Sequence, residues 1–411
     1  MLSSIILLKL ILAIVTPLGN DYTLYMTQVI LNGTDVPWSP WLTIAHSIYM
    51  FWLWLPISHG NVPGALVSEP NYLGLGGYLL TALIKLPLII CDAAVGVLVY
   101  LLALRSRFSV SSAQYAAVLW LANPLNTLFG EMWGSVEVIP VALSLAAIAL
   151  IILGHFRLSC VSLFTGIAFK LSPIIAWLAL VAWLQRKPRS EIGRLDRLLI
   201  YVSGPAGVLA YSYWLIQGHL TNILNLLQFF DPGYSGFAIP YSPVIQTLNE
   251  YFVPQTYVGL AMLGVTMFYV LAGKIWSRDS WSLVPLALSG FLLVYALSDP
   301  YPTSFLWIGP LIALWNAKYG KLNWTVLLYM IIGVFCTLFY IDVLISRSSL
   351  LFIPINIFPT APSESQQINI LESNVLLFSN IFGQWIRSAL SGMSLAYSMM
   401  VSWICIRKGR V

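Results

Sequence analysis

Ionisable side chains that lie inside or beside long apolar stretches are the residues of this sequence best placed to do chemistry. Lys170 stands in Lys170-Leu171-Ser172-Pro173, near the middle of the apolar segment 158–184. A charged group at the centre of a bilayer costs at least ~2.5 to 3.5 kcal/mol, so such a lysine needs a partner or a function. Proline breaks a helix, and irregular backbone at membrane depth is tolerated mainly where it lines a cavity. Lys170 could therefore bind a lipid phosphate, or it could form an ion pair with a neighbouring helix.

Two acidic residues are expected at the outer surface of the membrane. Asp21 directly follows the first apolar stretch, where a membrane-embedded leaving group would emerge, and a carboxylate there could act as a general base. The alternative is that Asp21 caps a short helix starting at Tyr22. Glu137 begins another apolar stretch, so it could bind the hydroxyls of a sugar or complement the dipole of its helix. Farther inside, Lys85 and Asp92 lie two helical turns apart and could share a polar seam or pair with other helices.

Several kinds of site have no support in the sequence. There is no Walker A loop, no dinucleotide-binding glycine pattern and no His-Glu-x-x-His, and the four histidines are scattered. The four cysteines fall inside apolar stretches, which is typical of packing residues rather than disulfides or thiolate ligands. Neither nucleotide nor zinc chemistry has support, so we predict no cofactor, no residues assigned to a metal and no nucleic-acid partner, while dependence on a divalent metal stays open.

The elements that must position these residues are apolar helices. The chain has 411 residues, of which 59% are hydrophobic and only 9% are charged, and its mean hydropathy is +0.84. No soluble domain could bury so much apolar surface, so we predict an all-α, polytopic transmembrane helical bundle in a single membrane domain over residues 1–411. Stretches long enough to cross a bilayer are expected at 2–18 (an uncleaved first span), 76–104, 112–129, 137–154, 198–216, 257–273, 281–297, 303–317, 323–346 and 374–404.

Sidedness depends on how segment 158–184 is interpreted. A single crossing there would export the basic stretch between Arg186 and Arg197, against the positive-inside rule. If the segment instead breaks at Pro173 and returns as two short helices, fifteen of the twenty basic residues are cytoplasmic, and so are both termini. About 10 to 13 spans result. The alternative, a true span at 41–57, would destroy this charge asymmetry.

In the same topology, the longest loops lie on the outer side of the membrane. These loops cover 19–75, 218–254 and 346–373, and the first loop is expected to hold interfacial helices at 21–31 and 41–57. Residues 1–184 form the half that carries most of the candidate site, and residues 185–411 form a second helical half. Function is expected on the outer side.

Three blocks of sequence resemble the type-C integral membrane glycosyltransferases, in particular the first mannosyltransferase of glycosylphosphatidylinositol assembly and prokaryotic polyprenyl-phosphate-sugar transferases. The first block is Asn20-Asp21-Tyr22. The second runs from Lys85-Leu86-Pro87 through Leu119-Trp120-Leu121-Ala122-Asn123-Pro124 and Gly134-Ser135-Val136-Glu137 to Gly166-Ile167-Ala168-Phe169-Lys170-Leu171-Ser172-Pro173, and the third is Asp299-Pro300-Tyr301 before Phe305-Leu306-Trp307. Gly19 stands where the family has a first aspartate, so a metal-binding Asp-x-Asp is not preserved.

The resemblance implies an enzyme that moves a sugar, with mannose expected, from a polyprenyl or dolichyl phosphate to a lipid-linked or glycan acceptor. It assigns Asp21 as the base, Lys170 to the donor phosphate, and Tyr22, Glu137, Asp299 and Tyr301 to substrate binding. The expected partners are the lipid donor, the acceptor and membrane lipids, in the cell membrane of a prokaryote or the endoplasmic reticulum of a eukaryote. Whether a small membrane subunit is a further partner stays open. Two alternatives are a transporter or lipid flippase, which should show repeat symmetry that this sequence lacks, and a noncatalytic membrane subunit.

Overall fold

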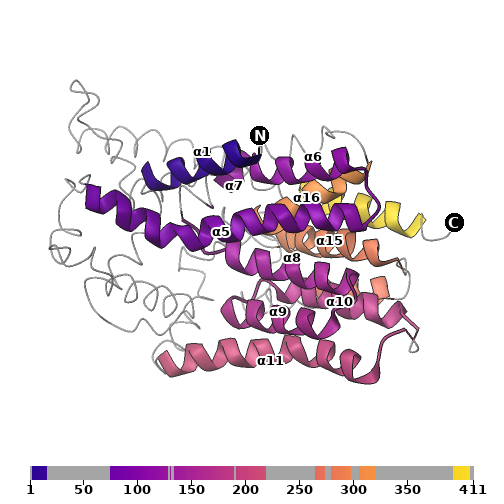
Figure 1. Cartoon of the computed structure of the whole chain (residues 1–411). Coiled ribbons are helices and arrows are strands. Elements are labelled where there is room, and N and C mark those ends of the chain that lie inside the picture. Colours follow the sequence, from indigo (N-terminus) through magenta and orange to yellow (C-terminus); the bar gives the residue numbers. More distant parts are fainter. Residues whose placement is uncertain are drawn as a thin grey trace.

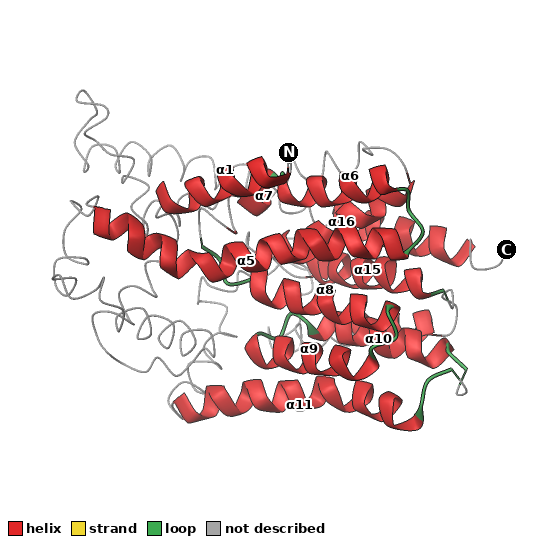
Figure 2. Cartoon of the chain, viewed as in Figure 1, coloured by secondary structure: helices red, strands yellow, loops and turns green. Residues whose placement is uncertain are grey.

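The part of the chain that the structure describes is helical throughout. The computed structural model describes residues 2–15, 75–127, 130, 134–188, 191–218, 264–273, 279–297, 305–319 and 392–407, and no strand occurs among them (Figure 2). This confirms the all-α prediction. The named helices are α1 (Leu2–Val15), α5 (Leu75–Arg105), α6 (Val110–Leu121), α7 (Pro124–Asn126), α8 (Val138–Ile152), α9 (Phe156–Phe169), α10 (Ile174–Arg186), α11 (Arg194–Gly218), α15 (Leu283–Leu297) and α16 (Phe305–Tyr319). Helices also cover 264–273 and 392–407, and a short 3-10 turn, Ser280–Ser282, precedes α15.

The helices lie side by side with roughly aligned axes (Figure 1). In chain order, α5 packs against α6 and α8, α8 packs against α9, and α9 packs against α11. The first helix lies on α5, while α16 packs against α6 and α15, and α15 packs against α10. Segments far apart in the sequence therefore meet in one apolar core.

The connectors between α5 and α6, between α8 and α9 and, in its described part, between α10 and α11 lie at one end of this array (Figure 1). The first two reverse the chain with the same hydrogen-bond pattern. After α8, His155 N–H donates to Leu150 C=O and Gly154 N–H donates to Ile151 C=O; after α5, Phe108 N–H donates to Ala103 C=O and Arg107 N–H donates to Leu104 C=O. Gly154 (φ +86°) and Arg107 (φ +63°) hold the left-handed position of this Schellman motif.

Basic residues gather around these connectors. Arg105 ends α5, Arg186 ends α10 and Arg194 begins α11. Lys318, in the last turn of α16, places its ammonium 4.1 Å from the centre of the Trp281 ring and 5.9 Å from that of Phe108, which brings α16 to the same end. These four basic residues, which the sequence predicts on one side of a membrane, thus lie at one end of the described helices.

The predicted break inside segment 158–184 is present. Helix α9 ends at Phe169, residues 170–173 form a turn, and α10 begins at Ile174. The expected helix at 112–129, in contrast, was wrong in its extent, because α6 ends at Leu121. Asn123 is extended and its side chain caps α7, and Pro124 has no N–H with which to continue α6.

By length and composition, one helix in the described ranges could cross a membrane, Lys85–Arg105 within α5. The described ranges also contain shorter apolar helices of 10 to 17 residues, among them α8, α9 and α10. The expected interfacial helices at 21–31 and 41–57, the span at 323–346 and most of the outer loops lie outside the described residues.

Candidate functional site

Lys170 is positioned by the break between two helices. Its backbone is extended (φ −157°, ψ 144°) at the residue after α9, and its N–H donates to Gly166 C=O. Pro173 is the N-cap residue of α10, a position at which the N–H that proline lacks would have no partner within the helix in any case. The lysine side chain leaves the chain where neither helix covers it fully, and 40% of it is exposed.

The side chain of Lys170 meets Glu137, which lies at the start of α8. Lys170 Nζ donates to Glu137 Oε1 in an ion pair. The carboxylate makes no capping hydrogen bond to α8, and its side chain is only 5% exposed. The ion pair that the sequence left open as one alternative for Lys170 is therefore formed, with Glu137 as the partner.

A tryptophan from a distant part of the chain holds the other oxygen of this carboxylate. Trp307 Nε1–H, in the first turn of α16, donates to Glu137 Oε2 over 2.7 Å. The indole stacks on Tyr295 of α15, with ring centroids 6.3 Å apart and an interplanar angle of 14°. Both oxygens of a nearly buried carboxylate are thus fixed by donors from α16 and from the break, which gives the group one orientation.

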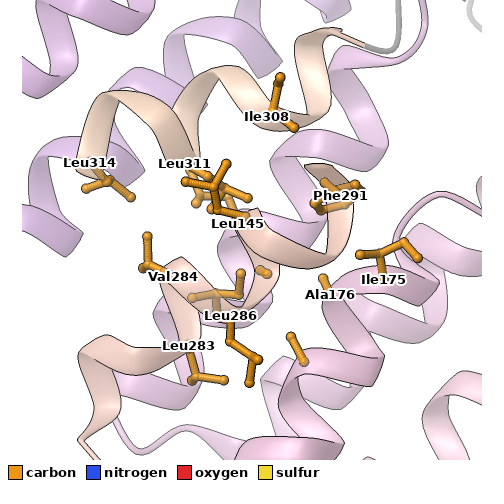
Figure 3. Close-up of a cluster of buried hydrophobic side chains, with 14 of the residues drawn as sticks. Leu145, Ile175, Ala176, Leu283, Val284, Leu286, Phe291, Ile308, Leu311 and Leu314 are labelled. Carbon is orange, nitrogen blue, oxygen red and sulfur yellow. The ribbon is translucent and has the colours of Figure 1, made fainter. Parts of the chain in front are cut away.

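An apolar pocket adjoins this trio. It is small and partly open, and it lies between α8, α10, α15 and α16. Trp307 belongs both to the pocket wall and to the trio, and Ser172 brings the 170–173 turn to the wall. Figure 3 shows Leu145, Phe291 and Leu311 of the wall within one cluster of buried side chains. An apolar surface thus lies beside a cation and a carboxylate.

A second polar cluster is fully buried and lies on α5. Asp92 Oδ2 accepts from Lys9 Nζ of α1 over 2.7 Å, and Asp92 Oδ1 accepts from Asn126 Nδ2 of α7 over 2.7 Å. Of the two possibilities stated for Asp92, a polar seam with Lys85 or pairing with other helices, pairing with α1 is the one formed. Lys85 is itself buried and packs beside Gly134.

The structure brings together two of the predicted site residues, Lys170 and Glu137. The other four, Asp21, Tyr22, Asp299 and Tyr301, lie outside the described residues. Trp307 was missed as a member of the site. Its signal in the sequence was weak, because it only closed the third block of the resemblance, and a contact between residues 137 and 307 has no local pattern.

Among the described residues, no three His, Cys, Asp or Glu side chains are grouped closely enough to hold a metal ion. The chemistry that the trio itself offers is a partly exposed ammonium beside an oriented carboxylate. In comparisons with known proteins, no family model matches this chain, and no curated protein does either.

Proposed function

We propose that this chain is a polytopic membrane glycosyltransferase that moves a sugar, with mannose as the first candidate, from a polyprenyl or dolichyl phosphate to a lipid-linked or glycan acceptor. The observation that carries the proposal is the position of Lys170. It is a lysine at a break between two apolar helices, partly exposed, beside an oriented carboxylate and an apolar pocket. The resemblance in the sequence supplies the reaction class.

Exposed apolar side chains support the membrane part of the proposal. Large apolar residues are more than 45% exposed on α1, α5, α9 and α11, on faces that no described helix covers: Leu7, Leu8, Ile11, Ile90, Val97, Leu101, Leu158, Val161, Leu198 and Leu209. A water-soluble protein rarely leaves so much apolar surface open. Lipid around the helices, with the basic connectors on the cytoplasmic side, accounts for both patterns.

Lys170 suits the phosphate of a lipid donor. Lys170 carries a positive charge and its side chain is 40% exposed, so a phosphate can approach the ammonium beside Glu137. The apolar wall next to Trp307 is suited to the first part of the lipid chain. When the donor phosphate binds Lys170 in place of Glu137, the Glu137 oxygen that had accepted from Lys170 accepts a hydrogen bond from a hydroxyl of the sugar.

The proposed reaction is an inverting displacement. Asp21 removes the proton from the acceptor hydroxyl, whose oxygen forms a bond to the anomeric carbon while the bond from that carbon to the phosphate oxygen breaks. The lipid phosphate leaves with the electron pair, and Lys170 stabilises its added negative charge. Tyr22, Asp299 and Tyr301 orient the sugar and the acceptor.

The proposal is tested by incubating membranes that contain the chain with radiolabelled polyprenyl-phosphate mannose and, in parallel, with polyprenyl-phosphate glucose. Label should appear in an acceptor from one donor, and membranes with Asp21→Asn should lose this transfer. Movement of intact labelled lipid across the bilayer without any transfer would instead identify a flippase and overturn the proposal.

A further inference from the structure

Asp92 is the centre of a buried network that joins three separate parts of the chain. Its carboxylate accepts from Lys9 of α1 and from Asn126 of α7, both over 2.7 Å, and its backbone carbonyl accepts from Trp120 Nε1 of α6 over 3.3 Å. The side chains of Lys9 and Asp92 are 3% and 2% exposed. One residue of α5 therefore bonds α1, α6 and α7.

Such a network specifies position more than it adds stability. Burying a lysine and an aspartate removes both from water, and the attraction between them often no more than offsets that cost. An apolar contact between α1 and α5 could be as stable, but it would tolerate sliding of one helix along the other. Two directional bonds to one carboxylate allow a single register.

The bonded segments are those that lead to the predicted acids of the site. Helix α1 ends at Val15, and the chain then continues to Asp21. Asn126 ends α7, and the chain then continues to Gly134 and Glu137. Gly134 in turn rests on Lys85, which lies two helical turns from Asp92 on α5: a β-carbon on Gly134 would lie 3.2 Å from Lys85 Cε, and the φ of Gly134, +71°, favours glycine.

We infer that Asp92 is a positioning residue, which through Lys9 and Asn126 fixes α1 and the segment before Glu137 in one register relative to α5. This inference rests on the proposed function, because its consequence is the placement of Asp21 relative to the site at Glu137 and Lys170. Asp92 touches neither substrate nor reacting atoms. It acts through the two segments it holds.

The test uses the full-length purified protein with Lys9→Met, with Asp92→Asn, and with the exchange Lys9→Asp plus Asp92→Lys. Each single substitution should lower kcat for sugar transfer about a hundredfold with the donor KM within about twofold, and the exchange should restore much of it. Arg157→Met, which breaks an exposed ion pair with Asp196, is the matched control and should change neither constant. Helical circular dichroism checks that each variant is folded.

A second readout does not depend on transfer. Spin labels on exposed positions of α1 and α11, at Leu7→Cys and Leu209→Cys in a background without native cysteines, report the placement of α1. Lys9→Met should shift or broaden the distance distribution, and the exchange should restore it. Absence of transfer by the unmodified protein would refute the proposed function alone. The positioning role would be overturned by an unchanged distance distribution in Lys9→Met. It would also be overturned if kcat in every variant fell only in proportion to the fraction of protein that is unfolded.

Discussion

Glu137 and Lys170 differ in exposure, and this predicts unequal effects when either charge is removed. Lys170→Met leaves the carboxylate of Glu137, only 5% exposed, without its ammonium, and we expect a loss of about 1 to 3 kcal/mol in the free energy of unfolding. Glu137→Gln leaves a lysine that is 40% exposed and can bind water, so its effect should be smaller. Thermal unfolding in detergent measures both.

The double variant Lys170→Met with Glu137→Gln serves as the control for this pair. It removes both charges together, so its loss should be smaller than the sum of the two single losses. A larger loss for Glu137→Gln than for Lys170→Met would contradict the described ion pair.

The second residue-scale prediction concerns the indole of Trp307. Trp307→Phe keeps an aromatic ring next to Tyr295 but removes the N–H that donates to Glu137 Oε2 over 2.7 Å. A hydrogen bond to a charged group contributes about 1.5 to 3 kcal/mol, so thermal unfolding should show a loss of that order. Trp403→Phe, at an exposed position of the last helix, is the matched control and should be near neutral. Equal losses in the two variants would show that ring size, not the bond to Glu137, is what matters.

Individual residues could be predicted from the sequence only where a local pattern marked them. Lys170 was identifiable because a charge beside Pro173 interrupts an apolar segment, and Glu137 because it begins one. Their pairing, the bond from Trp307 and the pair of Lys9 with Asp92 could not be predicted. They join residues that are distant in the chain, and composition and periodicity carry no information on which helices become neighbours.

At the scale of elements, the two Schellman connectors make opposite predictions. A residue with a β-carbon in the left-handed conformation costs roughly 1 to 2 kcal/mol. Arg107→Gly should therefore raise the free energy of unfolding by about 1 kcal/mol, and Gly154→Ala should lower it by a similar amount. Thermal unfolding of the two variants is the measurement.

Packing does not compete with this explanation at Gly154, because a β-carbon there would meet no atom within 4 Å. Gly392→Ala is the matched control. It also has open space around it but no left-handed φ, and it should be near neutral. A loss at Gly392 equal to that at Gly154 would remove the conformational argument.

Of the two helix breaks at a proline, one was predicted from the sequence and the other was missed. The break between α9 and α10 could be predicted from Lys170 and Pro173, because a charge and a proline lie close together there. The break after α6 was not predicted, although Asn123-Pro124 carries the same physical signal. Apolar residues on both sides made hydropathy continuous, and hydropathy alone does not register a proline or an Asn cap.

For the whole molecule, the gathering of basic residues at one end predicts its orientation in a membrane. In a background without native cysteines, His155→Cys in the exposed α8–α9 connector should react with a membrane-impermeant maleimide only from the cytoplasmic side. The glycosylation sequon Asn32-Gly33-Thr34, which the sequence places in the first outer loop, should be modified in a eukaryotic membrane. The sequon Asn323-Trp324-Thr325, which is expected inside or at the membrane, should not. Labelling of His155→Cys in intact cells would contradict the topology.

The fold class at this scale followed from composition, because so high an apolar fraction leaves little choice other than packed helices. The register of the helices and their neighbours did not follow from it. Hydropathy shows only that a helix is apolar. Which helix packs against which depends on the fit of individual side chains, such as Trp120 of α6, which fills the space beside Gly309 of α16.

Transfer with Asp21 as the base and Lys170 at the donor phosphate is tested most directly by steady-state kinetics, in which the purified protein in lipid is given a range of concentrations of radiolabelled polyprenyl-phosphate mannose and an extract of lipid-linked glycans. We expect labelled acceptor with the unmodified chain, loss of transfer with Asp21→Asn, and a raised donor KM with Lys170→Met. Full transfer by Asp21→Asn and an unchanged donor KM in Lys170→Met would contradict these roles.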